Sequence, residues 1–153
     1  MKNKNFLQSL HCAIKGFLCA VKSEYNLKLD LSLMLSVVYF ALFYGISKIE
    51  WVLLVLIFAL VISAELFNTA LENAVDTATK EYCESAKIAK DTAAAAVLAC
   101  SFGALVCAFI IFGDIGCWIL ALKTIFANPV YGVLFCALAI VDIACLLYRR
   151  KGI

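Results

Sequence analysis

Charged residues are scarce in this chain. They make up 16% of its 153 residues, whereas 65% are hydrophobic, and the mean hydropathy is +1.00. This balance excludes an ordinary soluble domain and indicates an integral membrane protein. Because each spanning helix uses about 20 residues, we expect an all-α, polytopic bundle of several membrane helices. The net charge of +2 is too small to suggest a nucleic-acid partner.

Three familiar signals are absent. The eight cysteines form no Cys-x-x-Cys pair and lie mostly in apolar runs, so we interpret them as free, buried thiols rather than metal ligands or disulfide partners. No G-x-x-x-x-G-K-[ST] motif occurs, which excludes a P-loop nucleotide site. Lys15 and Lys22 interrupt the first apolar stretch and no small-residue cleavage site follows, so no signal peptide is expected.

Four apolar segments are long enough to cross a bilayer. They are residues 29–46, 51 to about 77, about 93 to 112, and 130–148, the last opened by Pro129, the only proline. Before them, the large apolar residues of 6–21 fall within an arc of about 120°, which predicts an amphipathic helix lying in the membrane interface. Residues 115–127 are too short and too mixed to span, and we expect an interfacial connector there.

Lysine and arginine predict the orientation of the spans. Most of them fall on one side, opposite Lys48 and Lys123. These are Lys2, Lys4, Lys15, Lys22, Lys28, Lys80, Lys87, Lys90, Arg149, Arg150 and Lys151. Because basic loops stay in the cytoplasm, both termini are expected there, in the bacterial inner membrane. Trp51, Trp118 and Tyr148, near span ends, are expected as interfacial anchors.

One span carries a stripe of polar residues. Glu65, Asn68, Glu72 and Asp76 stand at offsets of 0, 3, 7 and 11, which places them within about 80° of the helix circumference and along about 16 Å of its length. Counted from Trp51, Glu65 lies about 21 Å into a hydrocarbon layer of about 30 Å. An ionised carboxylate in a span costs at least about 2.5 kcal/mol, so the stripe indicates function; the alternative is a helix that lines a polar bundle interior.

Two further polar clusters, 22–26 and 87–91, are expected to meet this stripe if the helices fold back antiparallel. Glu24 and Glu72 could then hold Mg²⁺, which takes one or two carboxylates and phosphate oxygens. Lys90 could neutralise phosphate charge, and Glu65, the most desolvated group, is suited to take a proton from a lipid hydroxyl. For Glu24 and Lys90, ordinary juxtamembrane charge is the competing interpretation.

This pattern predicts an ATP-dependent lipid kinase. Two other classes stay open: a small proton-coupled multidrug transporter that uses the intramembrane glutamate, and a non-catalytic accessory protein. A transporter needs its glutamate to be reachable from both sides of the membrane. Here the stripe opens only towards the cytosol, where it meets the Lys and Glu clusters, and this asymmetry favours the kinase.

The segment Glu65-Leu-Phe-Asn-Thr-Ala-Leu-Glu-Asn-Ala-Val-Asp76, followed by Lys90-Asp-Thr-Ala-Ala-Ala-Ala-Val97, resembles the bacterial diacylglycerol/undecaprenol kinase family. The resemblance covers about residues 5–112, including Lys15-Gly16 and Glu24. It implies a homotrimer of three-span protomers with shared active sites. By position it implies the following roles: Glu65 as catalytic base, Glu24 and Glu72 as Mg²⁺ ligands, Glu81, Tyr82, Cys83, Lys90 and Asp91 as ATP contacts, and Asn68 and Asp76 as supporting residues.

The chain also departs from the family pattern. Asn5, beside Lys4, stands where the family usually has an arginine, and Cys12 where some members have a tyrosine. Residues 114–153, with the fourth span, extend beyond the usual length, so we divide the chain into a kinase domain (1–113) and a C-terminal extension (114–153).

Two finer expectations concern a carboxylate and the substrate. We expect Asp142 in the extension to snorkel towards Arg149 and Arg150 rather than face the bundle. Glu24-x-Asn26 and the alanine-rich run after Asp91 resemble the branch that acts on undecaprenol, which favours that substrate over diacylglycerol.

Overall fold

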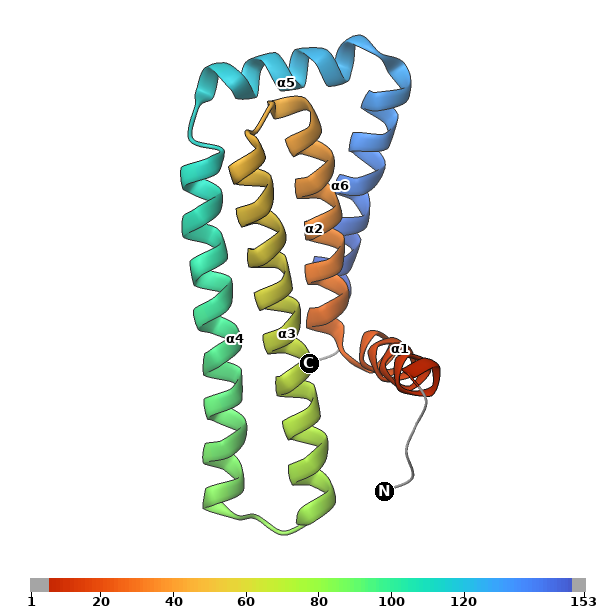
Figure 1. The fold of residues 1–153 in the computed structure, drawn as a ribbon, viewed down its shortest axis with the longest axis vertical. Coiled ribbons are helices and arrows are strands. Elements are labelled where there is room, and N and C mark those ends of the chain that lie inside the picture. The colour runs from red at the N-terminus through yellow and green to blue at the C-terminus, as the bar shows by residue number, and fades with distance from the viewer. Residues whose placement is uncertain (1–5, 150–153) are drawn as a thin grey trace.

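The computed structural model describes residues 6–149, without the side chains of Tyr148 and Arg149. The expectations placed on Lys2, Lys4, Asn5, Arg150 and Lys151 therefore lie outside the described residues. Within 6–149 all regular structure is helical (Figure 1). The helices are α1 (Phe6–Ser23), α2 (Tyr25–Tyr44), α3 (Lys48–Ala78), α4 (Glu84–Ile111), α5 (Ile115–Ala127) and α6 (Pro129–Arg149).

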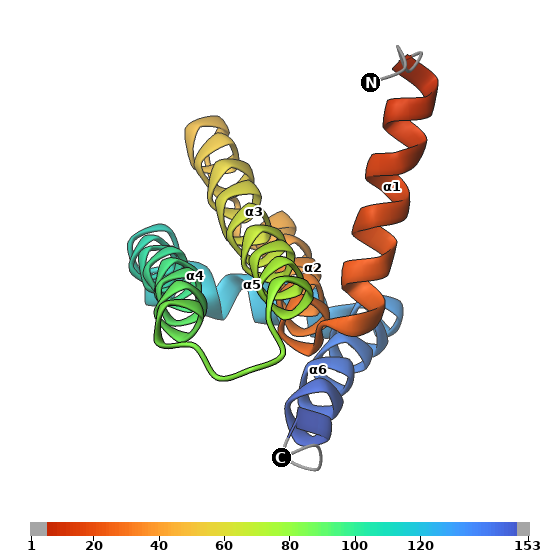
Figure 2. The ribbon, with the colours of Figure 1, turned by 90° about the horizontal axis from the view of Figure 1, so that it is seen from below.

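Four of these helices, α2, α3, α4 and α6, are long and apolar enough to cross a membrane. They run along the long axis of the molecule, while α5 lies across one end of the bundle (Figure 1). Seen along that axis, α1 points outward, away from the bundle (Figure 2). The predicted multi-pass helical bundle, with an amphipathic first helix and a short connector at 115–127, is confirmed.

The two ends of the bundle are built differently. We call the end with the α3–α4 turn (79–83) the hairpin end and the opposite one the α5 end. At the α5 end, Gly45 takes the left-handed conformation (φ 83°) that ends α2. Ser47 then caps α3, since its hydroxyl accepts from the Glu50 backbone N–H while the Glu50 carboxylate accepts from the Ser47 N–H. Asp114 caps α5 by accepting from Gly116 N at 2.7 Å.

Two helices begin earlier than the sequence analysis placed the spans. α2 begins at Tyr25 rather than residue 29, and α4 at Glu84 rather than about residue 93. Hydropathy marks only the apolar part of a helix, whereas these helices continue through polar residues. The 31 residues of α3 correspond to about 46 Å, longer than a hydrocarbon core of about 30 Å. The α3–α4 hairpin is therefore long enough to project beyond the membrane.

The packed core lies towards the α5 end, where α2 meets the C-terminal helices. Phe40, Ala121 and Ile125 form its buried cluster. Trp118 lies over Phe40 with ring centroids 4.5 Å apart, and its indole N–H donates to the Phe112 carbonyl at 2.6 Å. α5 and α6 thus pack directly on α2.

Asp142 faces the bundle, so our preference for snorkelling was wrong. Its carboxylate accepts hydrogen bonds from the hydroxyls of Ser32 and Ser36, the latter at 2.6 Å. The physical reason is that α6 packs along α2 and meets two serines one helical turn apart. Hydrogen bonding between spans is an established use of such polar residues in membranes.

The cysteines were predicted only in part. All eight are free, as expected, but none is buried: four are exposed and four partly exposed. The spans have few neighbours within the single chain, so apolar helix positions face outward. In an apolar solvent such as lipid, that exposure has little cost.

Candidate active site

The polar stripe lies on the face of α3 that is most enclosed. Glu65 and Thr69 are buried, with 3% and 6% of their surfaces exposed. The Thr69 hydroxyl donates to the Glu65 carbonyl at 3.0 Å, and the Asn68 amide donates to the Glu72 carboxylate at 2.9 Å. The structure therefore brings Asn68 and Glu72 together and leaves Glu65 deepest in the bundle.

The Asn68 side-chain oxygen is buried and has no hydrogen-bond partner within the described part of the chain. A buried acceptor left unpaired costs about 1–3 kcal/mol, and such groups are rare in native proteins. This oxygen lies beside the Glu72 carboxylate, which the same amide orients. Together they present hard oxygen atoms that suit a cation or a hydroxyl donor.

At the hairpin end the stripe reaches a cation. The Lys90 ammonium lies 2.5 Å from the Asp76 carboxylate. The two side chains are 34% and 67% exposed, and a pair this exposed contributes at most about 1 kcal/mol. Lys90 can therefore exchange its partner for a phosphate with little loss.

A pocket of about 340 Å³ opens at this end. It collects six of the residues assigned to ATP or to its support. These are Asp76, Glu81, Tyr82, Cys83, Lys90 and Asp91. Two lysines, Lys80 and Lys87, join Lys90 in its lining, so three cations surround one pocket. Such a concentration of ammonium groups favours a polyanion.

The pocket wall is shaped by the 79–83 turn. The Thr79 hydroxyl accepts from the Glu81 N–H at 3.2 Å, which closes the turn. Cys83 is the residue before α4, and hydrogen bonds from the backbone N–H groups of Ala86 and Ser85 lower the pKa of its thiol. The N-terminus of α4, which attracts negative charge, thus opens into the pocket.

Glu24 lies at the junction of α1 and α2, in an extended conformation and half-buried. Glu24 is 20 residues from Tyr44, the last residue of α2, and Asn68 is 20 residues from Lys48, the first residue of α3. Because both helices rise about 1.5 Å per residue from the same turn, Glu24 lies at the depth of Asn68, between Glu65 and Glu72.

The candidate metal donors are oxygen atoms, which suit a hard divalent cation. Within residues 6–149, no three His, Cys, Asp or Glu side chains gather in one place. A Mg²⁺ held by one or two carboxylates, water and phosphate needs no such cluster. Glu72, Glu24 and the unpaired Asn68 oxygen offer the oxygen chemistry that this ion requires.

Sequence reasoning missed two contributors to the site. Lys80 was treated only as a topology signal, yet it lines the pocket together with Lys90. Thr79 received no role in the sequence analysis, although it closes the turn. The available signal was the five-residue length of the 79–83 turn, which forces its side chains into a small space.

A spanning helix that joins a buried carboxylate to a basic pocket is the arrangement expected of a membrane-embedded enzyme with a polyanionic co-substrate. Comparison with known proteins agrees. The family model for prokaryotic diacylglycerol kinase matches residues 11–112. The chain belongs to this family and is a multi-pass membrane lipid kinase, for which ATP is the phosphate donor.

Two curated relatives are similar over the same region. The undecaprenol kinase of Bacillus subtilis (strain 168) is 33% identical over 102 residues, which cover 67% of this chain and 81% of the relative. The diacylglycerol kinase of Synechocystis sp. (strain ATCC 27184 / PCC 6803 / Kazusa) is 37% identical over 103 residues, which cover 67% of this chain and 59% of the relative. No solved structure matches.

Proposed function

We propose that this lipid kinase transfers the γ-phosphoryl group of ATP to the hydroxyl of a polyprenol such as undecaprenol, with diacylglycerol as the second candidate. The observation that carries the proposal is the single face of α3. It leads from buried Glu65, through the Asn68–Glu72 pair, to the Asp76–Lys90 pair at a basic pocket. That face connects the membrane depth at which the hydroxyl of a lipid alcohol would lie with the pocket proposed for the nucleotide.

In the reaction, Glu65 accepts the proton of the lipid hydroxyl. The alcohol oxygen forms a bond to the γ-phosphorus while the bond to the β–γ bridging oxygen breaks, and ADP leaves. Glu72 and Glu24 would hold Mg²⁺, which would neutralise phosphate charge when bound. Lys90, assisted by Lys80 and Lys87, neutralises the triphosphate.

The remaining assigned residues have supporting roles. Asn68 orients Glu72, and Asp76 holds Lys90 until the nucleotide arrives. Glu81, Tyr82, Cys83 and Asp91 line the nucleotide pocket. Tyr82, whose side chain is 83% exposed, can close over a bound base.

The same proposal includes orientation, assembly and domain division. The hairpin end, with Lys80, Lys87 and Lys90, faces the cytoplasm of a bacterial inner membrane, and so do both termini. Residues 1–113 form the kinase domain and 114–153 the extension. Homotrimers share active sites between protomers, and the poorly covered faces of α3 and α4 support association.

The test is transfer of labelled phosphate from ATP to undecaprenol or diacylglycerol in mixed micelles. Glu65→Gln keeps the shape of the side chain but removes the base, so turnover should fall by at least about a hundredfold while assembly is unchanged. Glu84→Gln, an exposed carboxylate in the first turn of α4, serves as the control and should retain activity. An active Glu65→Gln enzyme would remove the proposed base, and an inactive wild type would reject both substrates.

A further inference from the structure

The face of α3 that carries Glu65 continues towards the α5 end as an apolar strip. Leu54, Phe58, Val61 and Glu65 follow one another at intervals of four, three and four residues, so they lie along one side of the helix. Leu54 and Val61 are 3% and 5% exposed. This face of α3 is thus polar from Glu65 towards the hairpin end and apolar towards the α5 end. A lipid alcohol has the same division, with a polar hydroxyl at one end of an apolar chain.

A groove runs beside this strip. Its inner part, of about 290 Å³, is lined by Leu54, Ile57, Phe58 and Val61 of α3, together with residues of α2 and α4. Its outer part, of about 560 Å³, lies between α2, α4 and the C-terminal helices. The two parts share four lining residues, so they adjoin, and we call them together the groove. The shared residues are Leu33, Val37, Leu105 and Ala108.

The inner end of the groove lies at the depth of Glu65. Asp76 on α3 pairs with Lys90 on α4. Because the two helices are antiparallel, eleven residues from this contact towards the α5 end lead to Glu65 on α3 and to Ser101 on α4, which therefore lie at about the same depth. Ser101 lines the groove. From Ser101 to Gly113, the outermost α4-side residue of the groove, the helix rise gives about 18 Å.

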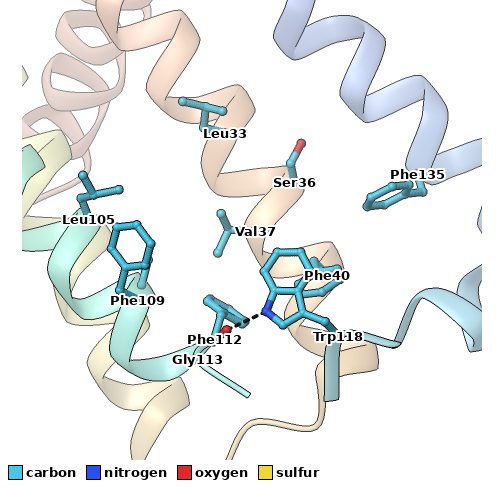
Figure 3. Close-up of a pocket in the computed structure, with 11 residues that line it drawn as sticks. Leu33, Ser36, Val37, Phe40, Leu105, Phe109, Phe112, Gly113, Trp118 and Phe135 are labelled. Atoms are coloured by element: carbon cyan, nitrogen blue, oxygen red, sulfur yellow. Dashed lines mark hydrogen bonds between the residues drawn. The ribbon is translucent and has the colours of Figure 1, made fainter. Parts of the chain in front are cut away.

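Aromatic side chains of α4 and of the extension border the outer part. Figure 3 shows Phe109, Phe112 and Trp118 around its floor, with Phe135 of α6 at its side. The hydrogen bond from the Trp118 indole to the Phe112 carbonyl fixes the ring across the end. Trp118 and Phe135 lie outside the family match of 11–112, so this side of the cavity is built by residues that the family model does not include.

We propose that the groove binds the isoprenoid chain of a long polyprenol, with its hydroxyl at Glu65 and its far part in the outer cavity that α5 and α6 border. The proposal rests on the proposed function, which favours a polyprenol as substrate. A short isoprenoid alcohol anchored at Glu65 ends in the inner part of the groove, whereas a long polyprenol continues into the outer cavity, which makes the extension a selector of chain length.

The first experiment locates the chain without requiring turnover. Wild-type protein in phosphatidylcholine nanodiscs is irradiated with a polyprenol of eleven isoprene units that carries a diazirine on its terminal unit, and labelled peptides are mapped. Labels within residues 104–118 and at Phe135, removed by excess unlabelled polyprenol but not by diacylglycerol, are expected. Labels spread over outward-facing positions and insensitive to competition overturn the proposal, as do cross-links that join two copies of the chain through the groove.

The second experiment measures selectivity. Ala108→Phe fills the junction between the two parts, whereas Ala99→Phe adds the same ring on the opposite side of α4, nine residues and about 180° away. We expect Ala108→Phe to lower kcat/KM for the eleven-unit alcohol at least about tenfold and for a three-unit alcohol by less than about twofold, with Ala99→Phe close to wild type for both.

Equal losses on both alcohols, or no loss on either, overturn the assignment of the groove. If the wild type phosphorylates neither alcohol, the proposed function fails, while the labelling result still decides whether the groove holds a polyprenyl chain.

Discussion

Lys90 and Asp76 join α4 and α3 near the hairpin end through a 2.5 Å contact between ammonium and carboxylate. The pair lies in a pocket that two other lysines also line. Because Asp76 is the ion-pair partner of Lys90 and is itself well exposed, a triphosphate can displace it without leaving a buried charge.

The first prediction follows from this contact. Lys90→Gln should raise the KM for ATP about tenfold or more and change the KM for the lipid little, because the lost charge faces the nucleotide pocket rather than the groove. Initial rates with each substrate varied in turn separate the two constants. Lys28→Gln is the control, since the Lys28 ammonium contacts only the Lys22 carbonyl in the described structure. A rise in the lipid KM alone would contradict the assignment.

The second prediction concerns Cys83. Backbone N–H groups of Ala86 and Ser85 favour its thiolate and lower its pKa below the ordinary thiol value. A lowered pKa means that more thiolate is present at neutral pH, so alkylation by iodoacetamide should be faster than for a free thiol and should reach its plateau at a lower pH. Peptide mapping after brief labelling gives the rate.

MgATP should protect Cys83, because its side chain lines the proposed nucleotide pocket. Cys83→Ser removes the fast-labelled peptide and serves as the control. Equal labelling of Cys83 with and without MgATP would place the nucleotide elsewhere.

Residue spacing was sufficient to predict the arrangement along α3. Offsets of 0, 3, 7 and 11 determine a common helix face in any environment, and the short turn after α3 makes the α3–α4 pairing antiparallel. The hydrogen bond between Asn68 and Glu72 and the contact of Asp76 with Lys90 follow from that geometry. The family motif added the roles of Glu81, Tyr82 and Cys83, which spacing alone did not supply.

Contacts between helices that are far apart in the chain could not be predicted from the sequence. Asp142 is 110 residues from Ser32, and the hydropathy of α6 contains no signal for which helix it meets. Arg149 is close to Asp142 in the sequence and was therefore the expected partner of its carboxylate. Which groups the carboxylate meets depends instead on how α6 packs beside α2. The groove was missed for the same reason, since its walls come from helices whose packing no single segment encodes.

The third prediction tests the link between α6 and α2. Asp142→Ala leaves the hydroxyls of Ser32 and Ser36 without their acceptor and should destabilise the protein by about 1–2 kcal/mol, the range for hydrogen bonds between spans. Thermal unfolding in detergent of Asp142→Ala, Ser36→Ala and the double variant Asp142→Ala/Ser36→Ala measures the coupling. Additive losses would show that the two side chains act independently. Ser9→Ala, on exposed α1, controls for the loss of a hydroxyl.

The last prediction concerns the metal and separates it from the nucleotide. Glu72 is oriented by Asn68 and lies beside a buried oxygen that has no partner in the described residues. Glu72→Gln removes one negative charge but can keep the contact with Asn68, so the helix should remain folded. Because Mg²⁺ prefers charged oxygen ligands, the concentration of Mg²⁺ that gives half-maximal rate should rise at least about tenfold.

The matched variant Asn68→Asp distinguishes a metal role from general damage. It replaces the neutral amide with a second carboxylate, which strengthens a cation site but repels Glu72 when no cation is bound. Its thermal stability should therefore fall without Mg²⁺ and recover when Mg²⁺ is added, whereas Glu72→Gln should show a smaller response to the ion than the wild type. If added Mg²⁺ shifts the melting temperature of all three proteins equally, the ion binds away from Glu72, and its assignment to this face of α3 is wrong.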